Sequence, residues 1–505
     1  MQQREPGLDR NGALGEATLR FALFVAALCA ARIVGPRGPV YWDSFGYVSD
    51  AISGHLSGLG LGRPWFSWIG SKALHLAVAS GASLWSAEPI LRVFWTAFTS
   101  LAAPATHALA RRCGLTPRAS LLAALAVAFS PAFAHTSHQV LSDGPAVAAT
   151  LLALATASRA VDATQTRSAA LAGFTGGALL AFATGLREQS LFFAVSLVWI
   201  VVLVPASRRI AVAGAMAAGF ALVAAITVRL SLRLEPDWFA HIGMWREAMR
   251  HERSLHHHGV RDVAMYLAWV FSLGPATVSA AAIAWTRDRT LREVRGSILA
   301  GVCIPSLAQL ALLATYQDIA YSPRYLLPAL AGAIAIPAAR WCDRVLADRS
   351  TRDVSIALAL VVAPAAIAAP ILRAREAPLR AVLDGTPALL ANLPDDALVV
   401  TGQACGQVML TRRIVMNTSA RTVRWRSVCP GWSWPDDLAA DLERDRWQAQ
   451  TSRAEMRLHT PRVVAMDLRR DGWIGAGQGA HYETAAAYVR AHSDAVARGE
   501  IVVWR

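Results

Sequence analysis

Two aspartates lie just beyond the first long apolar run of the sequence, in the stretch GPVYWDSFGYVSDAISG. A carboxylate this close to hydrocarbon is costly unless it faces water, a partner or a substrate, so each is a candidate functional group. In a helix over 42–54, Asp43, Tyr47 and Asp50 fall at positions i, i+4 and i+7 and share one face. The alternative for both aspartates is a solvated carboxylate, which for Asp43 would cap the helix.

A third acid, Asp143, opens an apolar segment in HTSHQVLSDGPAVAATLLALA. Helix capping explains this residue. However, His135, His138 and Asp143 together also supply polar ligands at one end of the apolar segments. The adjacent histidines 256–258 suggest a metal site, but adjacent residues seldom bind one ion together, so a solvated loop is the better interpretation.

Arginines next to aromatic or acidic residues mark two further polar sites. In TGLREQSLFF, Arg187 and Glu188 lie between two apolar segments with almost no loop, so they must be at a membrane boundary or face a polar cavity. In YQDIAYSPRYLLPALAG, Asp318, Arg324 and Tyr325 precede another apolar segment. Arginine suits a phosphate because its planar fork donates paired hydrogen bonds.

The elements that position these groups are membrane helices. The chain has 505 residues, 54% hydrophobic and 17% charged, whereas soluble domains are about 25% charged. A net charge of +14 would suggest a nucleic-acid partner in a soluble protein. Here the basic residues cluster at the ends of apolar runs, so they indicate membrane topology and we predict no nucleic-acid partner. A crossing helix needs about 20 apolar residues, and about eleven windows qualify. They are 14–35, 88–110, 118–135, 143–159, 168–186, 189–206, 210–228, 263–285, 297–315, 324–341 and 354–372.

The basic residues also predict the orientation in the membrane. One alternating set of connecting segments, which includes the N-terminus, carries 18 arginines in 63 residues, and the other carries 11 basic residues in 105. The positive-inside rule makes the first set cytoplasmic. We therefore predict a cytoplasmic tail over 1–13, a membrane module over 14–374 and an extracytoplasmic domain over 375–505.

The first outer loop, 36–88, is too long for a simple connector, and long loops tend to carry function. Residues 65–86 are apolar with terminal tryptophans, which suits a helix at the membrane interface. The alternative, a further span, would invert everything downstream and conflicts with the distribution of arginines.

The C-terminal region has a mixed polar and apolar character. Residues 395–403 indicate a turn and a buried strand, and residues 481–492 indicate a helix. Cys405 and Cys429 could form a disulfide outside the cell or remain two free thiols. The predicted fold class is mainly α, a polytopic membrane helix bundle with a small extracytoplasmic α/β domain.

The motifs, in their order and spacing, resemble the GT-C membrane glycosyltransferases. The chain is most similar to bacterial family 39 and the RgtA/B/C/D-like group, which are related to protein mannosyltransferases and aminoarabinose transferases. The resemblance covers about residues 14–405 and rests on YWDSFGYVSDAISG, GRPW, SDGPAVAATLLALA, GLREQSL and SPRYLLPALAGAIAIPAAR. Many relatives have a second acid next to the first, whereas in this chain Ser44 follows Asp43. The resemblance therefore does not decide whether a divalent metal ion is required.

The resemblance implies a multi-pass enzyme of the bacterial inner membrane. It would move a sugar from a polyprenyl-phosphate donor, held against the lipid bilayer, to a glycan, lipid or protein acceptor at the outer face, with inversion at the anomeric carbon. Asp43 is the implied base, because a carboxylate within reach can remove the proton of the acceptor hydroxyl. Asp50, His138 and Asp143 are implied to orient the acceptor or a metal ion. Arg63, Arg187 and Arg324 are implied to bind the phosphate of the donor. Tyr47, Glu188 and Tyr325 are implied to support these residues.

Other classes of function fit less well. A transporter or lipid flippase would more often place its ionisable groups near the bilayer midplane and show related halves, and a non-catalytic scaffold would not need polar sites gathered at one face. The sequence also has no P-loop, no GxGxxG after a strand, no paired CxxC and no HExxH, so soluble nucleotide or zinc-protease chemistry has no support.

Overall fold

The computed structural model divides the chain into two compact units. Unit 1 comprises Met1–Pro36, His55–Ile69 and Arg92–Leu372, and unit 2 comprises Arg37–Gly54, Gly70–Leu91 and Arg373–Arg505. The residues that the structure describes are 10–38, 42–56, 58–244, 247, 260–287, 297–313, 323–346, 351–394, 397–401, 410, 414–415, 417, 424–427, 463–469 and 486–505. Asp318, the histidines 256–258, Cys405 and Cys429 lie outside these ranges.

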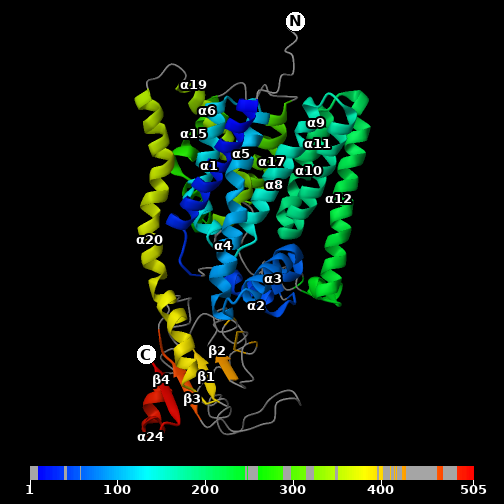
Figure 1. Ribbon diagram of the computed structural model, residues 1–505. Coiled ribbons are helices and arrows are strands. Elements are labelled where there is room, and N and C mark those ends of the chain that lie inside the picture. Colours follow the sequence, from blue (N-terminus) through cyan, green and yellow to red (C-terminus); the bar gives the residue numbers. More distant parts are fainter. Residues whose placement is uncertain are drawn as a thin grey trace. The chain divides into compact units, whose positions relative to one another are not determined.

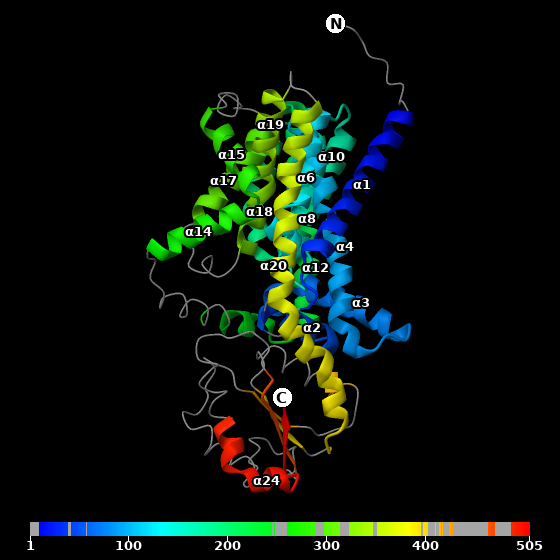
Figure 2. The same cartoon turned by 90° about the vertical axis from the view of Figure 1, so that its left-hand side faces the viewer.

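Unit 1 is a bundle of helices (Figures 1 and 2). Two of its described helices, α6 and α7, begin at a proline with a hydroxyl cap before it, at Thr116 and Ser130, whose side chains accept hydrogen bonds from Ala119 and Phe133. The helices that lie wholly in this unit are α1 (Arg10–Val34), α5 (Ala102–Arg112), α6 (Pro117–Ala128), α7 (Pro131–Ser137), α8 (Asp143–Ala157), α9 (Arg159–Asp162), α10 (Thr166–Leu186), α11 (Ala194–Leu203), α12 (Ala206–Leu234), α14 (Val260–Ser272), α15 (Pro275–Arg287), α17 (Ile298–Leu313), α18 (Leu327–Ala329) and α19 (Ile336–Val345).

Three helices contribute residues to both units. They are α3 (Pro64–Ala79), α4 (Ala87–Ser100) and the long α20 (Thr351–Ala391). The described residues of each of the eleven apolar windows are mainly helical. Within the described residues, six helices are long and apolar enough to cross a membrane, or eight if each of two bent helix pairs is one span. The number eleven therefore stays a prediction, because several windows are broken into shorter helices such as α4 and α5.

Helix α10 packs against α8 and α12 through glycines (Figure 1). A Cβ atom at Gly177 or Gly219 would clash with the backbone of the facing helix, at Met216 and Phe174 respectively. Without a hydrophobic driving force between helices in lipid, such close backbone approach supplies the packing contacts that hold membrane helices together. The contacts pair residue 173 with 212 and residue 177 with 216, so α10 and α12 run parallel.

Unit 2 contains helix α2 (Trp42–Ser53), the end of α20, a parallel sheet and the short helix α24 (Ser493–Ala497). The sheet is formed by β1 (Leu398–Thr401), β2 (Arg424–Ser427), β3 (Val464–Asp467) and β4 (Ile501–Trp504), in the order β2-β1-β3-β4. The strand expected after Asp395 is β1, and helical residues lie at 486–491 within the expected helix. Both faces of β3 are buried, as is usual for a parallel strand.

Candidate active site

A buried ion pair joins two of the polar sites picked out in the sequence. Asp143 is the first residue of α8, where a carboxylate also interacts favourably with the helix dipole. Arg187 follows the last residue of α10, and its Nη1 lies 3.0 Å from Oδ2 of Asp143. Their side chains are only 2% and 3% exposed. The same Nη1 donates to Ser142 Oγ at 3.3 Å, and Nε donates to Gln189 Oε1 at 3.4 Å.

Tyr325 links a second arginine, Arg324, to the pair of Asp143 and Arg187. The guanidinium of Arg187 lies 5.2 Å from the centroid of the Tyr325 ring, and that of Arg324 lies 5.0 Å from it. Arg324, which is 7% exposed, also donates from Nη2 to the Tyr325 hydroxyl at 3.1 Å. The aromatic ring stabilises both guanidinium groups, so Arg187 and Arg324 can lie near each other despite their like charges.

Arg63 and Glu188 extend the cluster. Arg63 directly follows the 3₁₀ turn Gly58–Gly62, and its Nε lies 3.5 Å from Oε2 of Glu188, the neighbour of Arg187 in the chain. Although half of the Glu188 side chain is exposed, crowding by protein atoms raises the pKa of its carboxyl, and Arg63 and Arg187 outweigh this effect and lower the pKa to about 2. Glu188 is therefore an anion at neutral pH.

The cluster keeps hydrogen-bonding capacity and positive charge for a ligand. Three arginines face two carboxylates, so the group carries an excess of one positive charge. Oδ1 of Asp143 is buried and accepts no hydrogen bond from any residue in the described part of the chain. Likewise, Nη2 of Arg187 donates to none of the described residues. One acceptor and one cationic donor thus remain side by side, which suits a ligand with both an anionic group and a hydroxyl.

His138 lies in a separate junction of helices. It is the residue after α7, its ring Nδ1 lies 3.2 Å from Thr96 Oγ1, and Gly35 packs directly against it. Burial, assisted by Arg92, lowers the pKa of His138 to about 3, so the ring is neutral at pH 7. Among the described residues, His138 and Asp143 do not belong to a group of three potential metal ligands.

Asp43, Tyr47 and Asp50 lie in α2 of unit 2, in the helix that their spacing predicts. Tyr47 and Asp50 are buried, at 1% and 2% exposure, and Asp43 is partly exposed in the first turn. Of the three, Asp43 is therefore the carboxylate with access to solvent. Their catalytic and supporting roles remain predictions.

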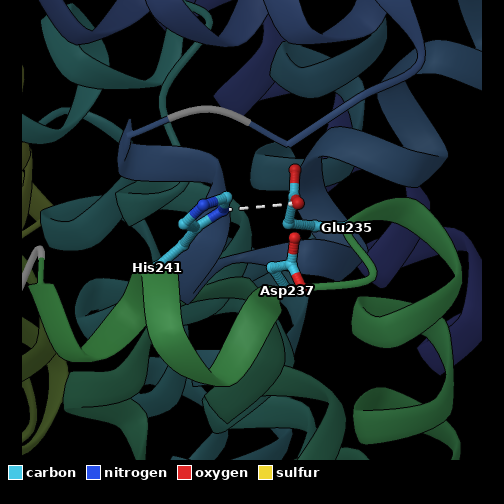
Figure 3. Close-up of side chains that lie close together, drawn as sticks. All are labelled: Glu235, Asp237 and His241. Atoms are coloured by element: carbon cyan, nitrogen blue, oxygen red, sulfur yellow. Dashed lines mark ion pairs between the residues drawn. The ribbon is translucent and has the colours of Figure 1, made fainter.

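The sequence interpretation missed one cluster of functional side chains. Glu235, Asp237 and His241 come together after α12 (Figure 3). The available signal was the spacing of an acid and a histidine four residues apart, next to a second acid. The roles of Ser142 and Gln189 as partners of Arg187 were also missed, because serine and glutamine are common and carry no distinctive pattern.

Residues 77–230 match the family model described as dolichyl-phosphate-mannose-protein mannosyltransferase. This segment includes Asp143, Arg187 and Glu188. No curated protein matches the chain.

Several solved structures are similar to the chain, and two structures of ArnT share its fold. ArnT from Cupriavidus metallidurans bound to undecaprenyl phosphate is 14% identical with a TM-score of 0.58, and its apo state is 15% identical with a TM-score of 0.51. Each match covers 82% of this chain and 90% of ArnT. The apo oligosaccharyltransferase of Archaeoglobus fulgidus is 12% identical over 81% of this chain and 64% of its own, with a TM-score of 0.45. The resemblance seen in the motifs is thus confirmed, and the chain has the GT-C membrane fold of ArnT.

Proposed function

We propose that this protein is a glycosyltransferase, which moves a sugar from a polyprenyl-phosphate carrier to an acceptor hydroxyl at the outer face of the bacterial inner membrane. The observation that carries the proposal is the buried pair of Arg187 and Asp143, to which Arg324 is linked through Tyr325 and Arg63 through Glu188, with an excess of positive charge. The structural neighbour ArnT was solved with undecaprenyl phosphate, an anionic lipid of the same class.

The arginines would bind the phosphate of the donor. Arg187 is held in place by Asp143, Ser142 and Gln189, which leaves its Nη2 to donate to a phosphate oxygen. Arg324 is oriented by its hydrogen bond to the Tyr325 hydroxyl, and Arg187 lies 5.2 Å from the centroid of the same ring. Fixed cationic donors stabilise the negative charge that develops on a departing phosphate without needing to reorganise.

The free oxygen of Asp143 would bind a hydroxyl group of the sugar or of the acceptor. Oδ1 is buried and still lacks a donor among the described residues, and a buried acceptor of this kind is costly until it is satisfied. A substrate hydroxyl at this oxygen would be oriented relative to the phosphate on Arg187. Such positioning of reacting groups contributes strongly to catalysis.

The proposed transfer is one displacement at the anomeric carbon. The acceptor oxygen forms a bond to the anomeric carbon as the bond from that carbon to the phosphate oxygen breaks, and the electron pair goes to the phosphate held by the arginines. The acceptor proton goes to a carboxylate base, for which the resemblance of the motifs makes Asp43 the candidate. Attack opposite the leaving phosphate inverts the anomeric configuration. The phosphate needs no proton to leave, which fits a site rich in arginine.

A divalent metal ion is the alternative occupant of the Asp143 oxygen. Carboxylate oxygen is a suitable ligand for such ions. Among the described residues, Asp143 does not belong to a group of three or more potential metal ligands. The proposal therefore places the phosphate and hydroxyl contacts on the protein side chains, with a divalent ion as the alternative.

Binding of the carrier tests the donor. Undecaprenyl phosphate should raise the melting temperature of the purified protein, whereas undecaprenol, which lacks the phosphate, should not. Arg187→Ala should abolish the shift. Arg112→Ala is a matched control, because Arg112 forms an exposed ion pair with Asp162. Equal shifts with both lipids would refute phosphate recognition.

The acceptor requires a cellular assay. Mass spectrometry of surface glycans, glycolipids and glycoproteins from a deletion strain should reveal a loss of one sugar from one class of molecule. Complementation with the wild-type protein should restore that sugar, and complementation with Asp43→Asn should not. An unchanged set of glycans would contradict the proposed reaction.

A further inference from the structure

Two carboxylates and an imidazole converge where helix α12 ends (Figure 3). Glu235 is the residue that follows α12, Asp237 lies in the turn after it, and His241 lies in the helical residues that begin at 238. One ligand atom of each side chain lies within 4.8 Å of the other two. The His241 and Glu235 side chains are 41% and 20% exposed, so an ion can reach them from solvent.

The distance between His241 and Glu235 fits two ligands of one ion better than it fits an ion pair. Nδ1 of His241 lies 3.3 Å from Oε1 of Glu235. A charge-assisted hydrogen bond between such groups is usually about 2.7–2.9 Å long. Two ligand atoms at zinc-bond lengths from one tetrahedral ion lie about 3.3 Å apart.

The local negative charge also favours a bound cation. Two carboxylates lie close together, and helix α12 directs the negative end of its dipole toward them. The Asp237 carboxylate makes no ion pair or hydrogen bond with another described residue, although it lies within 4.8 Å of both neighbours. A mixed imidazole and carboxylate ligand set favours Zn²⁺ or a similar transition metal over Ca²⁺ or Mg²⁺.

The cluster is connected to the arginine cluster described above. Trp238, between the ligands, donates from its indole nitrogen to the Leu61 carbonyl at 2.6 Å. Leu61 belongs to the turn Gly58–Gly62, and Gly60 of that turn accepts a hydrogen bond from the Arg63 backbone at 2.9 Å. Arg63 in turn contacts Glu188. An ion that fixes residues 235–241 would therefore also fix the turn that presents Arg63.

We propose that Glu235, Asp237 and His241 bind one Zn²⁺ ion, with water in the fourth position. The ion neutralises the two carboxylates and holds the segment after α12 against the Gly58–Gly62 turn. It is a structural ion, at a place separate from the Asp143 oxygen, and it positions Arg63 through the Trp238 contact. This inference concerns metal binding and does not depend on the identity of the donor or acceptor.

The test is metal binding by the full-length protein, purified in detergent through an affinity tag without histidine. After equilibrium dialysis against ZnCl₂, elemental analysis should find one Zn²⁺ per chain, and ZnCl₂ should raise the melting temperature of the EDTA-treated protein. His241→Ala and Asp237→Asn should each weaken binding by more than the 10- to 100-fold that loss of an outer-shell partner costs, and should remove the thermal shift. Glu235→Gln, which keeps the side-chain size, serves if either variant folds poorly.

Two controls separate this site from other histidines. His75→Ala removes an exposed histidine that contacts Ser71 outside the cluster, and it should bind Zn²⁺ like the wild type. A chain with histidines 256–258 replaced by alanine should also retain the ion. Loss of binding in that chain with retention in His241→Ala would place the ion elsewhere and overturn the proposal, as would the absence of stoichiometric binding to the wild type.

Discussion

Replacing Asp143 by asparagine tests whether the buried pair with Arg187 is both structural and functional. Asparagine keeps the shape of the side chain but cannot neutralise the guanidinium, which is 3% exposed. Removing one partner of a buried ion pair typically costs about 3–5 kcal/mol, since an uncompensated charge stays buried. The Tyr325 ring, 5.2 Å from Arg187, retains part of the stabilisation, so we expect a loss near the lower value, about 3 kcal/mol.

Arg187→Lys separates stability from phosphate binding. Lysine keeps the charge near Asp143 but lacks the fork that contacts Asp143, Ser142 and Gln189 while leaving Nη2 for a ligand. Loss of one charge-assisted hydrogen bond, about 1.5–3 kcal/mol, lowers kcat/KM about 10- to 150-fold. The melting temperature should fall less than in Asp143→Asn.

A double-mutant cycle measures the pair directly. Thermal unfolding and sugar transfer are measured for Asp143→Asn, Arg187→Gln and the double variant, and the double variant should lose less stability than the two single losses combined. Asp162→Asn is the control, because the exposed pair of Asp162 with Arg112 is worth only about 0–1 kcal/mol. If Asp143→Asn keeps wild-type stability and activity, the pair contributes to neither and the assignment of the site is wrong.

Three further predictions concern other parts of the chain. Asp43→Asn should reduce transfer by at least about 100-fold with little change in stability, and Asp50→Asn should reduce it less; an active Asp43→Asn enzyme would support the capping alternative. The pKa of His138 is lowered by burial to about 3, so its contribution to stability is present above the unfolded pKa of about 6.5 and falls by about 1.4 kcal/mol per pH unit below it. Thermal scans between pH 7 and 5 should thus show a smaller slope for His138→Asn, and an equal slope would contradict the assignment. Finally, reporter fusions at residue 350 and at the C-terminus should report opposite sides of the membrane; the same side for both would overturn the predicted topology.

The sequence was sufficient to place the charged residues at helix ends. Apolar length determines where a span begins and ends, and Asp143 does begin α8, while Arg187 does follow α10. Tyr325 and Arg324 likewise lie in a short turn before the helical residues that follow. These positions depend on local hydrophobicity, which is why they could be predicted from one chain.

The pairings could not be predicted in the same way. Hydropathy gives depth along a helix but not its neighbours in the plane of the membrane, so nothing indicated that Arg187 would contact Asp143 and the Tyr325 ring. The order β2-β1-β3-β4 was equally inaccessible, because it depends on pairing between strands far apart in sequence. The cluster at Glu235 was missed because its three ligands meet only when the chain turns after α12.

Small residues fix the geometry that the arginines need. Because α10 and α12 are parallel and packed through Gly177, their C-terminal ends lie at the same end of unit 1. At that end Gly185, two residues before Arg187, packs directly against the Trp65 ring, whose indole nitrogen donates to Thr227 of α12 at 2.7 Å.

Trp65 in turn lies two residues after Arg63. One tryptophan therefore contacts both helices near their ends and ties them to the segment that carries Arg63. A side chain at Gly185 would push Trp65 away and separate two arginines that both contact Glu188 electrostatically. The lateral packing of the helices, more than any loop, thus sets the spacing of the cationic cluster.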